Sequence, residues 1–344
     1  MREPYFRDEH VELHHGAALD VLRDLPDASV GCIFTSPPYY GLRAYGHDER
    51  EQGTEQTVAE FVGGLLEVFR EARRVLADDG TLWVNLGDTY SSKANARNTD
   101  AGRLGKGHAR VPQHVQGQRN TTAVAPYKSL LMIPERFALA MTDDGWLLRN
   151  RVTWVKTNGT PEPVTDRFTA KSEAMWLFTP GPRYWFDIDA VREPHTSRPQ
   201  RRLAKKVDKV GRPDGQSPQT WAAMTDRPEP AHDGHPLGRN PGDSWVVDDE
   251  DPAQFMDEVW RIPNRPFPGA HFAVMNPDVA RRAIKAGCKP GAAVLDPYSG
   301  SGTTGMVAAE LGHPYVGIEL YEKYLDLSLR TRLAQSSLLL GEGA

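Results

Sequence analysis

The residues best suited to chemistry lie at positions 35 to 39, where the sequence reads Thr35-Ser36-Pro37-Pro38-Tyr39. Consecutive prolines hold the backbone rigid, so the Ser36 hydroxyl and the Pro37 carbonyl oxygen would be fixed hydrogen-bond acceptors. Two such acceptors can polarise an amino group whose lone pair is delocalised into a ring, and Tyr39 offers an aromatic face for that ring. The motif alone is equally compatible with an ordinary proline turn.

A second chemical segment lies at residues 294–304 and reads VLDPYSGSGTT. Its two glycines would let the backbone approach a ligand closely, and the helix that follows would direct free N–H groups at that ligand. Glu319 lies where the next strand should end, and its carboxylate could accept hydrogen bonds from both hydroxyls of a ribose. The alternative is a tight turn with a solvent-facing Glu319.

Two common phosphate sites do not match this segment. A P-loop requires a lysine after its last glycine, and the dinucleotide fingerprint requires GxGxxG, and residues 294–304 contain neither. A nucleoside without phosphate therefore fits better.

These segments need a scaffold, and the hydrophobic periodicity predicts alternating strands and helices. Apolar runs predict strands at 30–35, 81–86, 151–156, 173–179, 183–187, 293–295 and 315–319, and helical spacing predicts helices at 58–76, 277–286 and 303–311. Asp78-Asp79-Gly80 would stop the first helix, and Asn276 followed by Pro277 would start the second. Strand–helix–strand order is typical of a parallel α/β sheet, whose strands present their carboxyl ends at one edge.

Composition limits the class of protein. A chain of 344 residues with 39% hydrophobic composition is long enough for one large α/β domain with an insertion, or for two modest domains. Its two cysteines, Cys32 and Cys288, cannot build a disulfide framework and lack metal-ligand spacing. No apolar run approaches the roughly 18 residues of a membrane helix. We therefore expect a cytoplasmic protein without structural zinc.

Charge is unevenly distributed along the chain. The formal net charge is −5, which argues against non-specific coating of nucleic acid, yet the stretch from Arg192 to Arg212 is strongly basic. It lies in a Pro-, Gly- and Arg-rich insertion at about 194–251, and a second polar stretch at 91–125 reads as a long surface loop, mobile without ligand. Composition alone leaves a solvated loop as an equal alternative for the basic stretch.

Together these motifs resemble a known family. TSPPY early in the chain, VLDPYSGSGTTG late and VGIEL after it are similar to the amino-methyltransferases of DNA in their beta arrangement, in which the catalytic segment precedes the cofactor loop. Two further segments add to the resemblance, HFAxxNP at 271–277 and TLWVNLGD at 81–88. The likeness covers about residues 11–190 and 256–334.

The resemblance implies a Rossmann-like α/β methyltransferase sheet that uses S-adenosylmethionine. It divides the chain into a catalytic half at 1–190, a target-recognition insertion at 191–257, a cofactor-binding half at 258–334 and a tail at 335–344. The basic stretch then falls in the insertion, which favours phosphate contact. The implied site residues are Ser36, Pro37, Pro38 and Tyr39 for catalysis; Thr35, His271, Asp296, Tyr298, Ser299, Gly300, Gly302, Thr303 and Glu319 for the cofactor; and Arg198, Arg201, Arg202, Lys205 and Lys206 for DNA.

Two positions depart from the family pattern. Tyr298 stands where phenylalanine is usual, which is a mild change. Gly16 is followed by Ala17 where the family commonly has Gly-Asp, so this position lacks the carboxylate that could contact the adenine amine of the cofactor.

The expected activity is methyl transfer from S-adenosylmethionine to the exocyclic amine of a flipped base in double-stranded DNA. The SPPY form favours cytosine N4, with adenine N6 as the alternative. Protein or RNA amino-methyltransferases can share a PPY motif, but their cofactor loop precedes it. A DNA-binding protein that keeps the fold without turnover is the rival from another class. The expectations include location at the nucleoid and a partner restriction endonuclease; the oligomeric state, with a homodimer among the options, stays open.

Overall fold

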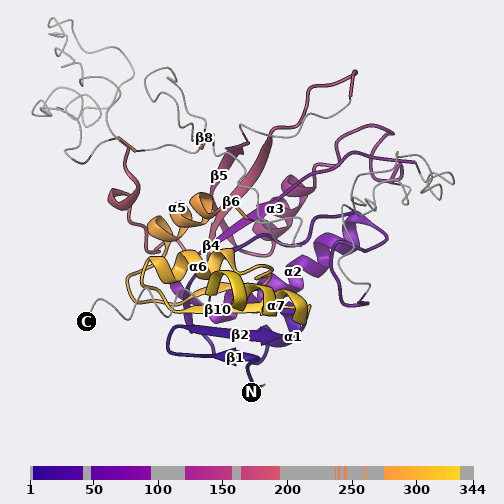
Figure 1. The fold of residues 1–344 in the computed structure, drawn as a ribbon. Helices are drawn as coiled ribbons and strands as arrows, with labels where there is room; N and C mark the ends of the chain where they lie inside the picture. Colours follow the sequence, from indigo (N-terminus) through magenta and orange to yellow (C-terminus); the bar gives the residue numbers. More distant parts are fainter. Residues whose placement is uncertain are drawn as a thin grey trace, which may run out of the picture.

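The computed structural model describes residues 3–41, 48–93, 121–156, 164–193 and 275–333, with short stretches at 237, 239–240, 244–245 and 260–261 (Figure 1). In these residues one ten-stranded sheet has the order β1-β2-β10-β9-β3-β4-β6-β5-β7-β8. Its strands are β1 Phe6–Arg7, β2 Val11–His15, β3 Val30–Thr35, β4 Leu76–Leu86, β5 Leu147–Val155, β6 Ser172–Thr179, β7 Ser244–Trp245, β8 Trp260–Arg261, β9 Val294–Asp296 and β10 Tyr315–Glu319.

The centre of the sheet is parallel. β2, β10, β9, β3 and β4 run in one direction, whereas β6 is antiparallel to both β4 and β5. The chain leaves β9 toward β10 on one side and leaves β3 toward β4 on the other, so the order reverses between β9 and β3. The carboxyl ends of adjacent strands at such a switch point are where open α/β sheets bind ligands.

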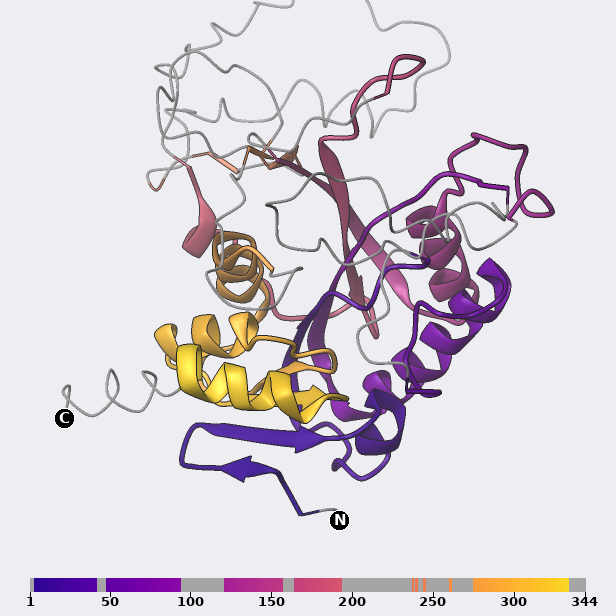
Figure 2. The same ribbon diagram turned by 45° about the vertical axis from the view of Figure 1, so that its right-hand side comes forward.

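Helices cover both faces of the sheet (Figure 2). One face packs against α1 Ala18–Leu22, α2 Val58–Val75 and α3 Ile133–Asp143. The other packs against α5 Pro277–Gly287, α6 Thr303–Glu310 and α7 Glu322–Ser328, with a short 3-10 turn at Asp189–Val191 and a π-helical turn at Leu329–Leu333. Alternate residues of β3 serve the two cores, since Ile33 faces the first and Cys32 and Phe34 face the second. The doubly wound α/β class expected from the sequence is confirmed.

Local signals explain where these helices begin. The Thr57 hydroxyl accepts from the Glu60 backbone N–H at 3.1 Å while the Glu60 carboxylate accepts from the Thr57 N–H at 2.9 Å, forming a capping box. Asn276 caps α5 by accepting from the Asp278 N–H at 2.8 Å. The predicted positions of β3 and β10 are confirmed, and those of α2, α5 and α6 agree to within a residue.

Two sequence expectations were wrong. The Asp78–Gly80 turn does not stop α2, because the helix ends at Val75 and Leu76 already has extended backbone and pairs with Val30 in β4. Residues 183–187 form no strand; the Trp185 N–H donates to the Asp79 carbonyl at 2.7 Å and the Asp187 N–H to the Ala286 carbonyl at 2.8 Å. Single hydrogen bonds to a carbonyl of β4 and to a carbonyl at the end of α5 satisfy this backbone without strand pairing.

In the part of the chain that the structure describes, every helix is too short or too polar to cross a bilayer. The polar loop was predicted at 91–125 and the insertion at about 194–251; residues 94–120 of the first and most of the second lie outside the described residues.

Candidate active site

One hydrogen bond joins the two chemical segments at the switch point. Thr35 ends β3, Asp296 ends the adjacent β9, and the Thr35 hydroxyl donates to Asp296 Oδ1 at 2.7 Å. Both side chains are buried. Residues that are 261 positions apart in the chain are therefore held together, and the catalytic motif that follows Thr35 lies beside the glycine loop that follows Asp296.

Asp296 is the polar centre of the cofactor loop. Its Oδ2 accepts from the Thr304 hydroxyl at 2.6 Å and its Oδ1 also accepts from the Tyr298 N–H at 3.0 Å. Burial raises the pKa of Asp296 to about 6, and these hydrogen bonds act in the opposite direction by favouring the carboxylate. The residue fixes the loop from inside, so it positions the residues that would touch a ligand.

The loop itself makes a close turn into α6. Gly302 precedes the helix with φ +78°, a left-handed backbone, and a Cβ at this position would lie 2.8 Å from the Ser328 Cβ. The Ser299 hydroxyl accepts from the Tyr315 hydroxyl at 2.8 Å, so it faces the core. Ser299, predicted to touch the cofactor, thus uses its side chain to join the loop to β10.

Glu319 ends β10 and is only 9% exposed. Its two carboxylate oxygens accept from the Gly300 N–H and the Tyr321 N–H, both at 2.9 Å. Burial raises its pKa to about 7. The Gly16 N–H donates to the Glu319 carbonyl at 3.0 Å, which places the Gly16–Ala17 turn beside this acid.

The predicted catalytic motif leaves the sheet at its carboxyl edge. Ser36 is half-buried, Pro37 is buried, and Tyr39 is half-buried with its hydroxyl 2.9 Å from both Asn85 Oδ1 and Glu173 Oε2. These two acceptors share the single hydroxyl proton. The Tyr39 ring lies against Gly87, where a Cβ would be 2.4 Å from the ring, so only glycine leaves room for it.

Three residues that support Tyr39 were missed by sequence reasoning. Asn85 on β4 also donates to the Ala174 carbonyl at 3.1 Å, and Glu173 on β6 is paired with Lys156, which directly follows β5. The pair is largely shielded from water. The available signal was a polar side chain within an apolar strand pattern: Asn85 in TLWVNL and Glu173 in SEAMWLF.

Residues 48–57 also contact the cofactor side of the candidate site. Gln52 accepts a hydrogen bond from the Tyr298 hydroxyl, and the buried Glu51 accepts from the Tyr321 hydroxyl at 2.6 Å. Burial and Glu51 raise the pKa of Tyr321 above its usual range. Glu51 and Gln52 therefore connect this part of the chain to the glycine loop at Tyr298 and to the residues after β10 at Tyr321.

The remaining residues predicted to bind cofactor or DNA do not all lie at this site. Thr303 begins α6 and accepts a hydrogen bond from Arg332, which also donates to Ser301 at 2.9 Å. His271 and the basic residues Arg198, Arg201, Arg202, Lys205 and Lys206 lie outside the described residues. Their roles stay predictions.

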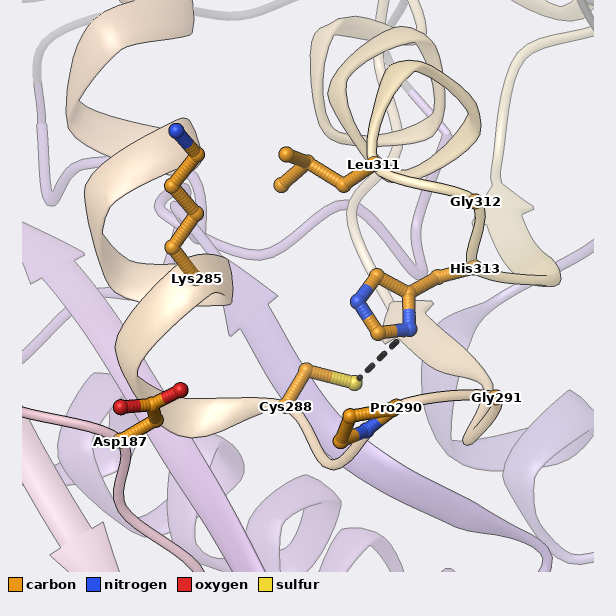
Figure 3. A pocket seen from close by; sticks show the side chains of 8 residues that line it. All are labelled: Asp187, Lys285, Cys288, Pro290, Gly291, Leu311, Gly312 and His313. Carbon is orange, nitrogen blue, oxygen red and sulfur yellow. Dashed lines mark hydrogen bonds between the residues drawn. The ribbon is translucent and has the colours of Figure 1, made fainter. Parts of the chain in front are cut away.

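A different pocket lies at the opposite edge of the sheet, before β9 and β10 begin (Figure 3). Cys288 and His313 line it, with Cys288 Sγ 3.5 Å from His313 Nδ1. Burial lowers the pKa of His313, while Cys32 and burial raise that of Cys288. Both groups are therefore held neutral, and the pocket lies at the sheet edge opposite to the one that carries Ser36 and Asp296. No three side chains of His, Cys, Asp or Glu are placed to hold a metal ion among the residues described.

Comparison with known proteins shows the family of the chain. A family model described as "DNA methylase", for N6 and N4 methyltransferases, matches residues 30–330. The type II methyltransferase M.Cfr9I of Citrobacter freundii is 36% identical over 95% of this chain and 91% of its own, and M.SmaI of Serratia marcescens is 34% identical over 91% and 87%.

Solved structures share the fold. A PvuII DNA methyltransferase described as cytosine-N4-specific matches with a TM-score of 0.55 at 17% identity, over 95% of this chain and 88% of its own. TTHA0409 of Thermus thermophilus, solved with S-adenosyl-L-methionine, matches with a TM-score of 0.50 at 23% identity over 95% of both chains. The expected methyltransferase sheet is thereby confirmed.

Proposed function

The chain belongs to the N6/N4 DNA methylase family, which uses S-adenosylmethionine, and we propose that its product is N4-methylcytosine in double-stranded DNA. Its relatives are type II methyltransferases, so we include a cognate restriction endonuclease among its partners. The observation that supports methyl transfer at this edge of the sheet is the 2.7 Å bond from Thr35 to Asp296, because it holds the residue before Ser36 against the first residue of the proposed cofactor loop.

The chemistry of the cofactor segment fits a nucleoside with a cationic sulfur. Glu319 offers a shielded carboxylate for ribose hydroxyls, and a second buried acid, Asp296, would disfavour a phosphate at the same place. The left-handed Gly302 turn supplies close backbone approach. S-adenosylmethionine bound there supplies a methyl group made electrophilic by its positively charged sulfur.

The catalytic motif acts on the amine that attacks this methyl group. Ser36 and the Pro37 carbonyl accept the two amine hydrogens, which draws the lone pair out of the ring and toward the methyl carbon. As the new C–N bond forms, the C–S bond breaks, its electron pair stays on sulfur, and one amine proton leaves to solvent. Tyr39, held by Asn85 and Glu173, presents its ring to the flipped base.

The choice of cytosine rests on Ser36. A carboxylate in this first motif position, as in DPPY relatives, is a stronger acceptor than a hydroxyl, and the SPPY form is associated with cytosine in the family that the chain resembles. The N4 and N6 amines are chemically similar, so pocket shape contributes to the choice as well.

Mass spectrometry of nucleosides from methylated DNA tests the proposal. We expect N4-methyldeoxycytidine from the wild-type chain; N6-methyldeoxyadenosine as the main product would overturn the cytosine assignment. Ser36→Ala should lower kcat sharply with unchanged cofactor affinity, since Ser36 acts on the amine. Ser29→Ala is the matched control, because Ser29 lies before the other end of β3 and its hydroxyl only donates to the Pro26 carbonyl.

A further inference from the structure

The connection between β5 and β6 lies at the same edge as the catalytic motif. β5 runs parallel to β4 and β6 returns antiparallel, so β5 ends and β6 begins at the edge where β3 and β4 also end. The described part of the connection, 164–171, extends beyond this edge of the sheet (Figures 1 and 2). Glu173, which binds the Tyr39 hydroxyl at 2.9 Å, follows directly on β6.

Phe168 in this connection is 97% exposed, more than any other large hydrophobic side chain among the described residues. The backbone around it is anchored on both sides. The Arg167 guanidinium lies 4.0 Å from the centre of the Tyr90 ring and donates to the Phe168 carbonyl at 3.1 Å, while the Lys156 N–H donates to the Lys171 carbonyl at 2.7 Å. The ring therefore projects from a fixed backbone.

The surroundings of Phe168 suit a polyanion. Residues 164–171 contain Arg167 and Lys171 against Asp166, which pairs with Lys128, so this segment carries a net positive charge. Phe168 and Glu173 are five positions apart, a span of at most about 17 Å for extended chain. A duplex that places one base against Tyr39 thus passes within reach of Phe168.

We propose that Phe168 inserts into the DNA duplex as an apolar wedge and fills the space left by the flipped base. Apolar side chains that insert between base steps offset the loss of stacking, and an exposed ring on an anchored backbone, at the sheet edge that carries Tyr39, has the required chemistry and position. The inference rests on the proposed function, because it presumes a target base taken out of duplex DNA.

The test compares two substrates after the methylated site has been mapped by sequencing. One is a duplex with the site fully paired; in the other the target base lies opposite an abasic position, so extrusion costs less. With Phe168→Ala we expect single-turnover methylation to be at least tenfold slower on the paired duplex, within twofold of wild type on the abasic duplex, and unchanged cofactor affinity. Phe168→Leu should recover part of the rate.

Leu139→Ala is the control, since Leu139 is also exposed, at 65%, but lies on α3. An equal loss on both substrates, with or without lost self-association of the chain, would overturn the wedge, as would no loss on the paired duplex. If sequencing finds no methylated site in DNA treated with the wild-type chain, the proposed function itself is overturned before Phe168 is tested, which separates the two failures.

Discussion

The charge state of Glu319 has opposite effects on folding stability and on cofactor binding. Its carboxyl is buried, and its pKa rises from 4.5 to about 7, so folding favours the neutral acid. Below about pH 4.5 the group is neutral in the folded and unfolded states; above about 7 it is charged in both, and burial then costs stability. The ligand-free protein should thus lose up to about 3 kcal/mol of Glu319-linked stability as pH rises from about 4.5 to above 7.

Cofactor affinity should depend on pH in the opposite direction. Ribose hydroxyls donate hydrogen bonds, so they prefer the Glu319 carboxylate, and lowering the pH from 8 to 6 should weaken binding by up to about tenfold. Calorimetry at the two pH values measures this. Glu319→Gln should bind more weakly at pH 8 and lose most of the pH dependence; an equally steep dependence in this variant would assign it to another group, such as Asp296 with its pKa of about 6.

The hydrogen bonds of Tyr39 should affect turnover more than binding. Lys156→Met leaves Glu173 without its cation in a shielded position, and Tyr39→Phe removes the hydroxyl but keeps the ring. We expect both changes to lower kcat, with cofactor affinity unchanged, because they loosen the ring that orients the base. Measuring kcat and KM for DNA separates the two effects.

Lys289→Met provides the matched control for Lys156. Lys289 likewise pairs with a carboxylate, that of Asp79 at 3.3 Å, but both side chains are more than half exposed. Exposed pairs contribute roughly 0–1 kcal/mol, and this one lies at the opposite edge of the sheet. If both lysine variants changed kcat equally, the hydrogen bonds of Glu173 would have no particular role in catalysis.

At the scale of elements, the end of β4 sets the position of the Tyr39 ring. Gly87→Ala would place a Cβ 2.4 to 3.1 Å from three ring atoms, which requires the ring to move. We expect a clear fall in kcat with little change in cofactor affinity. Gly63→Ala makes the same substitution within α2 where nothing lies within 4 Å, so it should leave activity unchanged and raise stability by up to about 1 kcal/mol.

The elements show which parts of the fold can be predicted from the sequence. Strands β3 and β10 were predicted at their observed bounds because both are apolar runs that end in a polar motif, and α5 was predicted from Asn276 and Pro277. The run at 183–187 has an equally aromatic pattern but forms no strand, since its backbone partners come from Asp79 and Ala286. Periodicity reports burial, and it does not report which neighbour supplies the hydrogen bonds.

At the scale of the molecule, the sequence predicted both halves of the site but not their support. The resemblance located Ser36 and Asp296, and the reversal of strand order between β3 and β9 brings them together. The shielded contacts of Glu173, Lys156 and Glu51 depend on strands and loops that are distant in the chain. No local pattern specifies such pairs, because they arise only once the sheet order is fixed.

The charge of the whole chain yields the last prediction. With a net charge of −5, DNA must bind to a locally basic region, and the sequence concentrates cations between Arg192 and Arg212. Replacing Arg201, Arg202 and Lys205 with glutamine should weaken DNA binding and reduce the slope of log affinity against log salt by up to about 0.9 for each phosphate that is no longer neutralised.

The matched triple variant replaces Arg7, Arg70 and Lys289 with glutamine, each more than half exposed and paired with an acid in the α/β body. It makes the same change in net charge, so an effect of overall charge would alter both slopes equally, whereas phosphate binding by the basic stretch should reduce only the first. Fluorescence anisotropy over a range of salt concentrations measures both slopes, and an unchanged slope in the first variant would make the stretch a solvated loop.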